Sequence, residues 1–252
     1  MTTYVVRVWL PDRPGALGSV ASRIGAVRGD LIGIEILERG AGRAIDELVV
    51  VLPDDELGDQ PERLIDIMSR EIGQVDGVDV EEVRELDSAA DPRLDALETA
   101  ALLVGSDNAD ELLAELCRHA SRCISATWTV VVEVETGNVR AMTGDAPDAG
   151  WLSAFIEGSR ESARLRAGAF EPEDVIWSPM PSAQTALVIG REGTAFRAKE
   201  RRQAAALARI ADSRFRSITE HSALSARLAH PSRSPQSSAQ SPARSTARFH
   251  SS

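Results

Sequence analysis

Residues 6–21 read Val-Arg-Val-Trp-Leu-Pro-Asp-Arg-Pro-Gly-Ala-Leu-Gly-Ser-Val-Ala and decide the fold of the first third of the chain. The alternating apolar residues up to Leu10 predict a strand, and the prolines and glycine of residues 11–15 end it. Small and aliphatic residues then recur at helical spacing, which predicts a helix with Pro14 in its first turn. A strand, a tight turn and a helix therefore open the chain.

The same patterns continue outward from this stretch. Alternating or β-branched residues predict strands at 31–38, 45–52 and 78–83, and an apolar stripe predicts a helix at 61–73. The resulting order is βαββαβ, the ferredoxin-like split arrangement. We therefore expect an α+β fold in which one antiparallel sheet packs against two helices.

This opening resembles that of an ACT domain, a family in which an apolar strand runs into an Asp/Asn-x-Pro-Gly turn and a small-residue helix. The resemblance implies a regulatory module that binds an amino acid, often at a dimer interface where the partner's second strand closes the pocket. The topology fits residues 3–87, and we assign residues 1–87 to an ACT-like ligand-binding domain. The residues that match the family pattern are Asp12, Pro14, Gly15, Leu17 and Val20.

The physical chemistry of the turn also suits a ligand. Gly15 lets a ligand approach the backbone closely, and the N–H groups at the helix start favour a carboxylate. Asp12 can accept hydrogen bonds from an ammonium group, so the turn suits both ends of a free amino acid. The resemblance adds the second strand, and the expected ligand-binding residues are Asp12, Arg13, Pro14, Gly15, Ala16, Leu17, Ile32, Gly33 and Ile34.

A purely structural interpretation of these residues stays open. In it the Pro-Gly pair makes the turn, Asp12 caps the helix and no ligand binds. Ile32 and Ile34 then belong to the core, whereas a glycine within a strand, Gly33, indicates close backbone approach. Trp9 points away from Val8, which suggests that its ring covers a dimer interface.

A second unit begins at residue 91. Two helices are expected first, the second capped by Asp107 or Asn108. A hairpin follows around Thr136-Gly137-Asn138, and short strands are expected at 175–177 and 185–189. Three tryptophans are expected to fill the core of this unit, and a long helix from Phe196 closes it. The tryptophans are Trp128, Trp151 and Trp177.

This arrangement resembles a shortened GAF-like α/β domain with an antiparallel sheet, covering residues 91–216. The cues are the Leu-Val-Ile-Gly strand at 187–190 and the spacing of Phe196, Glu200 and Leu207 in the last helix. The resemblance implies ligand binding, dimerisation or signal relay. The short region between the strands favours dimerisation or docking. Residues 217–252, rich in Ser, Pro and Arg, are assigned to a disordered tail.

Composition excludes several classes of protein. The 252 residues carry a net charge of −11, which disfavours binding to nucleic acids and anionic membranes. Residues 1–88 contain nine basic and nineteen acidic residues, so most of this charge lies in the first unit. No long apolar run predicts a membrane span. Two cysteines and no recognisable signal peptide lead us to expect a cytoplasmic protein.

Residues that suggest chemistry are few. Cys117, His119 and Cys123 are close in sequence, but zinc requires a further ligand set that is not visible. No catalytic or nucleotide-binding motif occurs. The basic residues of 197–202 allow two interpretations: a solvated face paired with Glu192 and Glu200, or a docking surface for an acidic partner such as the first unit.

We therefore expect a non-enzymatic regulatory protein without a cofactor. It would sense a free amino acid through its ACT-like domain, form a homodimer, and relay occupancy by dimerisation or by docking a partner. One alternative is a ligand-free dimeric interaction scaffold. Another is an enzyme whose active site lies in the second unit, which would require convergent titratable groups in a pocket.

Overall fold

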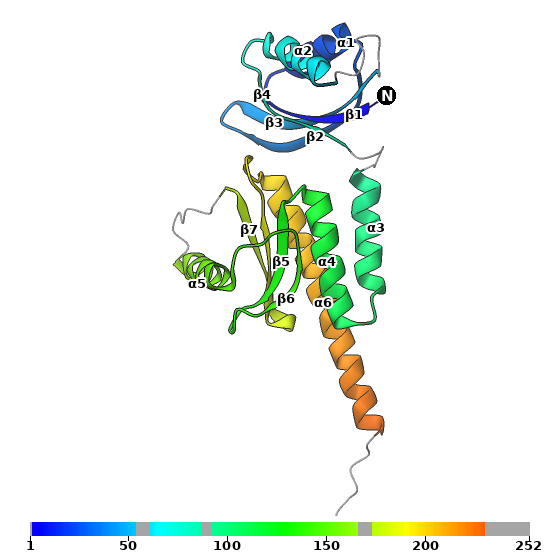
Figure 1. Ribbon diagram of the computed structural model, residues 1–252, viewed down its shortest axis with the longest axis vertical. Coiled ribbons are helices and arrows are strands. Elements are labelled where there is room, and N and C mark those ends of the chain that lie inside the picture. Colours follow the sequence, from blue (N-terminus) through cyan, green and yellow to red (C-terminus); the bar gives the residue numbers. More distant parts are fainter. Residues whose placement is uncertain (1, 54–60, 87–91, 166–172, 230–252) are drawn as a thin grey trace, which may run out of the picture.

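The computed structural model of the protein describes residues 2–53, 61–86, 92–165 and 173–229 (Figure 1). They form two units, each built on a four-stranded antiparallel sheet. The expected mixture of helices and antiparallel sheets is confirmed. The second unit lies against the face of the first sheet that its own helices leave free (Figure 1).

The first unit has the predicted βαββαβ order, with the sheet order β2-β3-β1-β4. Alternate aliphatic side chains of β1 and β3 face α1 and α2 and form one core cluster with them. The elements are β1 (Thr2–Pro11), α1 (Ala16–Ala26), β2 (Asp30–Gly40), β3 (Arg43–Leu52), α2 (Pro61–Gly73) and β4 (Asp79–Glu85).

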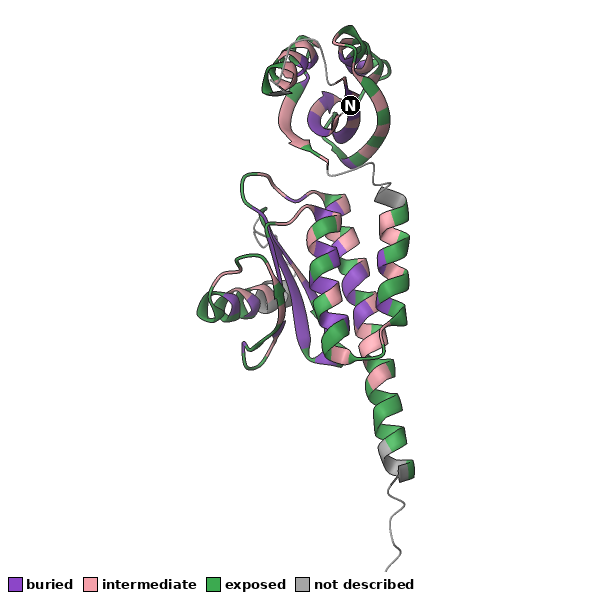
Figure 2. Cartoon of the chain, turned by 45° about the vertical axis from the view of Figure 1, so that its right-hand side comes forward, coloured by how far each residue is buried: buried purple, intermediate pink, exposed green. Residues whose placement is uncertain are grey.

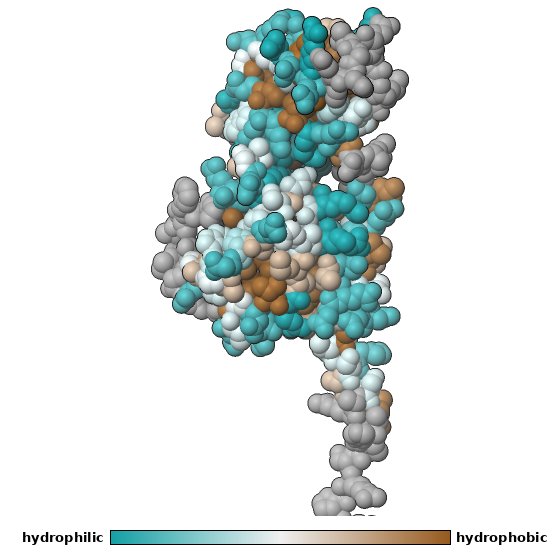
Figure 3. Space-filling model, viewed as in Figure 1, coloured by the Kyte–Doolittle hydropathy of each residue, from teal (hydrophilic) through white to brown (hydrophobic). Residues whose placement is uncertain are grey.

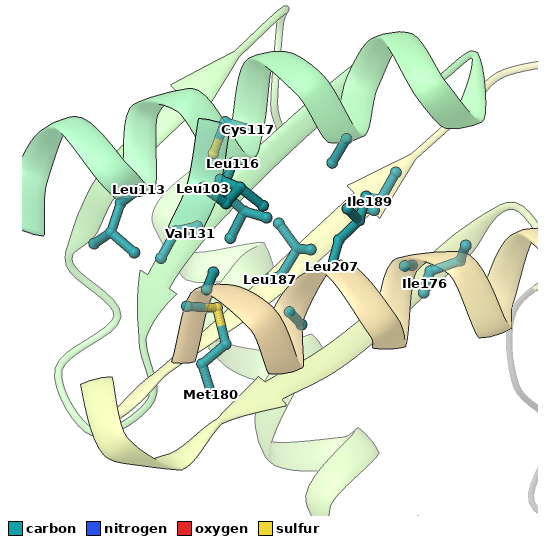
Figure 4. Close-up of a cluster of buried hydrophobic side chains, with 14 of the residues drawn as sticks. Leu103, Leu113, Leu116, Cys117, Val131, Ile176, Met180, Leu187, Ile189 and Leu207 are labelled. Carbon is teal, nitrogen blue, oxygen red and sulfur yellow. The ribbon is translucent and has the colours of Figure 1, made fainter. Parts of the chain in front are cut away.

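In the second unit the sheet order is β6-β5-β8-β7. Helices α4 and α6 cover one face of this sheet, α3 packs against the outer side of these two helices, and α5 covers the other face of the sheet (Figure 1). The main core lies between the helices and the sheet, where Leu116, Leu187 and Leu207 meet (Figure 4). The elements are α3 (Pro92–Gly105), α4 (Ala109–Ile124), β5 (Trp128–Glu133), β6 (Val139–Thr143), α5 (Ala149–Leu165), β7 (Val175–Met180), a short 3-10 helix (Pro181–Ala183), β8 (Thr185–Gly190) and α6 (Ala198–Ala229).

Two local features of the second unit were predicted from the sequence. Asn108 caps α4, because its side chain accepts hydrogen bonds from the N–H groups of Asp110 and Glu111. Trp128 lies in the smaller core cluster and Trp177 packs against it. Trp151 lies at the edge of this cluster and is 41% exposed: its ring packs edge-on against Trp128, with 6.2 Å between the ring centres, and stacks on Phe155.

The last helix is longer than the sequence predicted. α6 continues to Ala229 and projects beyond the body of the second unit (Figure 1). The prediction that a disordered tail begins at residue 217 is therefore wrong for 217–229, where many residues have good helix propensity despite the weak apolar pattern. Residues 230–252, the rest of that predicted tail, lie outside the described residues.

Candidate functional site

The turn between β1 and α1 has the conformation that glycine permits. Gly15 is the N-cap of α1 with φ 88°, and within the described part of the chain no side chain caps the first-turn N–H groups. The prediction that Asp12 caps the helix is therefore wrong, because glycine occupies the cap position three residues further on. The Asp12 backbone N–H instead donates to the Gly42 carbonyl at 2.9 Å, and its side chain is exposed. The start of α1 is thus open to an anionic group.

Asp46 is a buried carboxylate beside this turn. Its residue pairs with Val8 of β1 and with Ile36 of β2, so its side chain faces the helix-covered side of the sheet. Ala16, the first residue of α1, packs in the same core cluster as Val8. Asp46 is only 3% exposed, and its Oδ1 atom has no hydrogen-bond partner among the described residues. A buried, unpartnered carboxylate oxygen is costly, which indicates a role other than stability.

The burial of Asp46 and the charged residues around it shift the pKa of its carboxyl. Burial raises the pKa of its carboxyl above the usual value, Arg39 opposes this effect, and the carboxylate of Asp12 adds to it. The influence of Asp12 shows that the two acidic groups are near each other. A cationic group placed between them would relieve both the repulsion and the lack of a partner.

The second strand is an edge strand, and this explains the exposure of its isoleucines. Ile32 is 54% exposed and Ile34 is 46% exposed, so the prediction that they belong to the core is wrong. β2 has a neighbour on one side only, and two register shifts interrupt its alternation. Ile36, opposite the buried Asp46, is also exposed.

The predicted ligand-binding residues fall into two groups. Those of the turn stay together: Arg13 and Pro14 are exposed, Ala16 is buried and Leu17 packs against the core. Those of β2 lie two strands away from β1, with β3 between them. A Cβ atom at Gly33 would lie 3.1 Å from a Val49 methyl group, so packing within the sheet explains this glycine. The sequence pattern missed Asp46, because an acidic residue next to Glu47 in a strand resembles a solvent-facing position, although Ala44 and Leu48 on the same face belong to the core.

A buried ionic cluster joins the two units. Arg7 of β1 is 2% exposed and pairs with Glu47 of β3 at 2.7 Å and with Glu200 of α6 at 3.1 Å. Glu200 also pairs with Arg191 at 2.8 Å and accepts a hydrogen bond from the Arg197 backbone N–H at 2.7 Å. We call Arg7, Glu47, Arg191 and Glu200 the junction cluster.

The junction cluster keeps its charges. Burial opposes the charge of Arg7, but the carboxylates of Glu200 and Glu47 outweigh it and raise the pKa of the guanidinium. Burial likewise acts to raise the pKa of Glu200, but its hydrogen bonds from Arg191 and the charge of Arg7 leave it below the usual value. A change of tilt between the units would therefore expose or break buried ion pairs, which makes the contact specific.

The remaining inter-unit contacts decide between the two interpretations of the basic residues at 197–202. Arg197 pairs with Glu81 of β4 and Lys199 pairs with Glu35 of β2. For Arg197 and Lys199, docking onto the acidic first unit is thus the correct interpretation. The Arg197 guanidinium also lies 4.9 Å from the centre of the Trp9 ring. Arg43 also lies 5.2 Å from the centre of this ring, so Trp9 has partners within the chain, and its role at a dimer interface stays a prediction.

The other chemical candidates do not converge. Among the described residues no three His, Cys, Asp or Glu side chains are placed to hold a metal ion. His119 is buried between α3 and α4, with its Nδ1 atom 3.2 Å from Thr99 Oγ1. Burial raises the pKa of the Cys117 thiol to about 12. None of the helices in the described ranges is both long and apolar enough to cross a membrane.

Comparisons with known proteins assign no family. No family model matches the chain, and no curated protein matches it significantly. A formyltetrahydrofolate deformylase from Pseudomonas putida shares 17% identity over 41% of this chain and 38% of its own, with a TM-score of 0.27. An unknown protein from Galdieria sulphuraria shares 10% identity over 75% and 78% of the chains, with a TM-score of 0.27. A 3-hydroxy-3-methylglutaryl-coenzyme A reductase from Streptococcus pneumoniae shares 10% identity over 94% and 64%, with a TM-score of 0.24.

Proposed function

We propose that this protein is a non-enzymatic regulatory protein that binds a free amino acid at the β1–α1 turn. The observation that carries the proposal is the buried, unpartnered Oδ1 atom of Asp46 next to the uncapped start of α1. The ligand's ammonium group would pair with Asp46 and Asp12, and its carboxylate would accept hydrogen bonds from the first turn of α1. The exposed Ile34 and Ile36 provide apolar contact for its side chain.

Occupancy would reach the second unit through the sheet. Asp46 and Glu47 are adjacent on β3 and point to opposite faces, so one residue faces the ligand turn and the next belongs to the junction cluster. A ligand that shifts β3 would act directly on the buried pair between Glu47 and Arg7. The same ligand would stabilise a homodimer if a partner's β2 closes the site.

Isothermal titration calorimetry of the full chain with the twenty amino acids tests the proposal. At least one is expected to bind with a dissociation constant below about 1 mM. Asp46→Asn and Gly15→Asp should each weaken that binding at least tenfold, because the first removes the charge and the second places a carboxylate at the anion position. Asp66→Asn, an exposed acid on α2, is the matched control and should bind normally.

The alternative of a ligand-free dimeric scaffold gives a different result. The melting temperature would then be independent of every amino acid, although the chain would still self-associate. Absence of binding to the wild type, or unchanged affinity in both variants, would contradict the proposed site.

A further inference from the structure

The outer side of α3 carries exposed apolar side chains. Leu97, Ala101 and Val104 are spaced by four and three residues, so they lie on one side of the helix. Leu97 is 70% exposed and Val104 is 57% exposed. Figure 2 shows α3 as mostly exposed, and Figure 3 shows hydrophobic side chains along its outer margin. Contiguous exposed apolar side chains mark surfaces that contact another molecule.

This apolar side ends at a groove between α3 and α6. The groove has a volume of about 510 Å³, and apolar side chains from both helices line it together with two arginines. These residues are Val104, Ala206, Ile210, Arg209 and Arg214. Arg214 is already paired, because its guanidinium lies 2.8 Å from the carboxylate of Asp107. The groove therefore combines an apolar floor with one arginine, Arg209, whose charge is available to a partner.

Arg209 belongs to a column of arginines on the α6 wall. Arg202, Arg209 and Arg216 repeat every seven residues, which is close to two helical turns, so all three lie on the side of α6 that lines the groove. All three residues are exposed, and none of them forms an ion pair with another described residue. The column is about 21 Å long at 1.5 Å per residue. Glu220, one turn beyond Arg216, ends the cationic run.

We propose that this groove binds an acidic amphipathic helix of a partner protein. The apolar side of that helix would pack on Val104, Ala206 and Ile210, as amphipathic helices do in apolar grooves. Its carboxylates would pair with the arginine column where they recur every seven residues, because the two helices then share one repeat. A helix of about 14 residues covers the whole column.

The charge and the shape of the groove favour this occupant over others. The unpaired guanidinium groups would repel a basic partner, and an uncharged partner would cover them without supplying a hydrogen-bond acceptor. A flat anionic bilayer cannot enter a groove between two helices, and the net charge of −11 repels it. A narrow, acidic and partly apolar helix satisfies both walls at once.

Fluorescence anisotropy with a labelled synthetic helix tests this inference, which does not rest on amino-acid binding. The probe is a peptide of about 18 residues, long enough to span the column, with leucine on one side of the helix and glutamate on the other. A second peptide carries lysine in place of each glutamate. We expect the full chain to bind the glutamate peptide with a dissociation constant below about 100 μM, and the lysine peptide at least about tenfold more weakly.

Charge reversals locate the binding surface and guard against a folding defect. Arg209→Glu should weaken binding of the glutamate peptide at least about tenfold. Arg63→Glu, the same change at an exposed arginine of α2, is the matched control and should leave the affinity unchanged. The triple variant Arg202→Glu, Arg209→Glu and Arg216→Glu should bind the lysine peptide in preference, which a misfolded chain would not do.

Four results would overturn the inference. Two are the absence of binding to the glutamate peptide and equal binding of the two peptides. The third is sedimentation of the full chain with vesicles of equal parts phosphatidylcholine and phosphatidylglycerol that Arg209→Glu abolishes, because the groove would then face a membrane. The fourth is a change in the sedimentation coefficient of the peptide-free chain on Arg209→Glu, because a second copy would then cover the groove.

Discussion

At the scale of single residues, Asp46 is expected to lower the stability of the fold and to support ligand binding. Its raised pKa means that ionisation of this carboxyl is less favourable in the folded chain than in the unfolded chain, so its ionisation costs stability. This cost is absent at low pH and grows as pH rises through the folded pKa. Asp46→Asn should therefore raise the free energy of unfolding at pH 7 by about 1–2 kcal/mol while weakening ligand binding at least tenfold. Urea unfolding with calorimetry measures both, and a less stable variant that still binds ligand would contradict the assignment.

A substitution at Gly15 tests the conformation of the turn independently of any ligand. A Cβ atom there would have no described residue within 4 Å, so crowding by these residues does not explain the glycine, but its φ of 88° is unfavourable for other residues. Gly15→Ala should cost about 1 kcal/mol. Gly18→Ala is the matched control, because it lies inside α1 with equally open space and should gain about 0.5–1 kcal/mol. Equal effects of the two changes in thermal unfolding would argue against a left-handed Gly15.

At the scale of the elements, the local sequence pattern was sufficient to predict a strand or a helix where one kind of interaction determines it. Residues 6–21 combine alternation, a turn and a helical stripe, and the structure contains the predicted strand and helix there. The alternation of 31–38 also predicted β2 correctly, but not the exposure of its isoleucines. Burial depends on the place of a strand in the sheet, and β2 lies at the edge.

The ends of elements and the partners of charged residues were harder to predict. The apolar stripe of the last helix fades after residue 211, but helix propensity carries α6 to Ala229. Arg7 looks like a solvent-facing residue of an amphipathic strand. Its partner Glu200 is 193 residues away in sequence, and only the docking of the two units brings them together.

The packing of α3 against α4 contains a pH-sensitive residue. Burial lowers the pKa of His119, the charges of Arg118 and Arg122 add to this, and Glu115 opposes it. The unfolded state therefore takes up a proton first, and stability should fall as pH drops below the unfolded value of about 6.5. Thermal unfolding at about pH 7.5 and pH 5.5 should show a smaller acid-induced loss in His119→Gln than in the wild type. Parallel curves for the two proteins would exclude this role.

At the scale of the whole molecule, the junction cluster makes two small units into one. Each unit has its own core, and the inter-unit contact is mainly polar, so its strength depends on complete pairing of the buried charges. Removing one partner leaves the others buried without compensation, which is more costly than the pair itself is favourable.

Glu200→Gln tests this dependence. The change leaves Arg7 and Arg191 facing each other without their shared carboxylate, so the free energy of unfolding at pH 7 should fall by about 3–5 kcal/mol. Because the folded pKa of Glu200 is lowered, its contribution is present above the unfolded value of about 4.3 and is lost as pH falls through the folded value. Urea unfolding at pH 7 and about pH 3 should therefore show the variant and the wild type converging in acid. The exposed Glu192→Gln is the control. If Glu200→Gln lowers the free energy of unfolding by only about 0–1 kcal/mol, as for a surface ion pair, the junction cluster does not hold the units together.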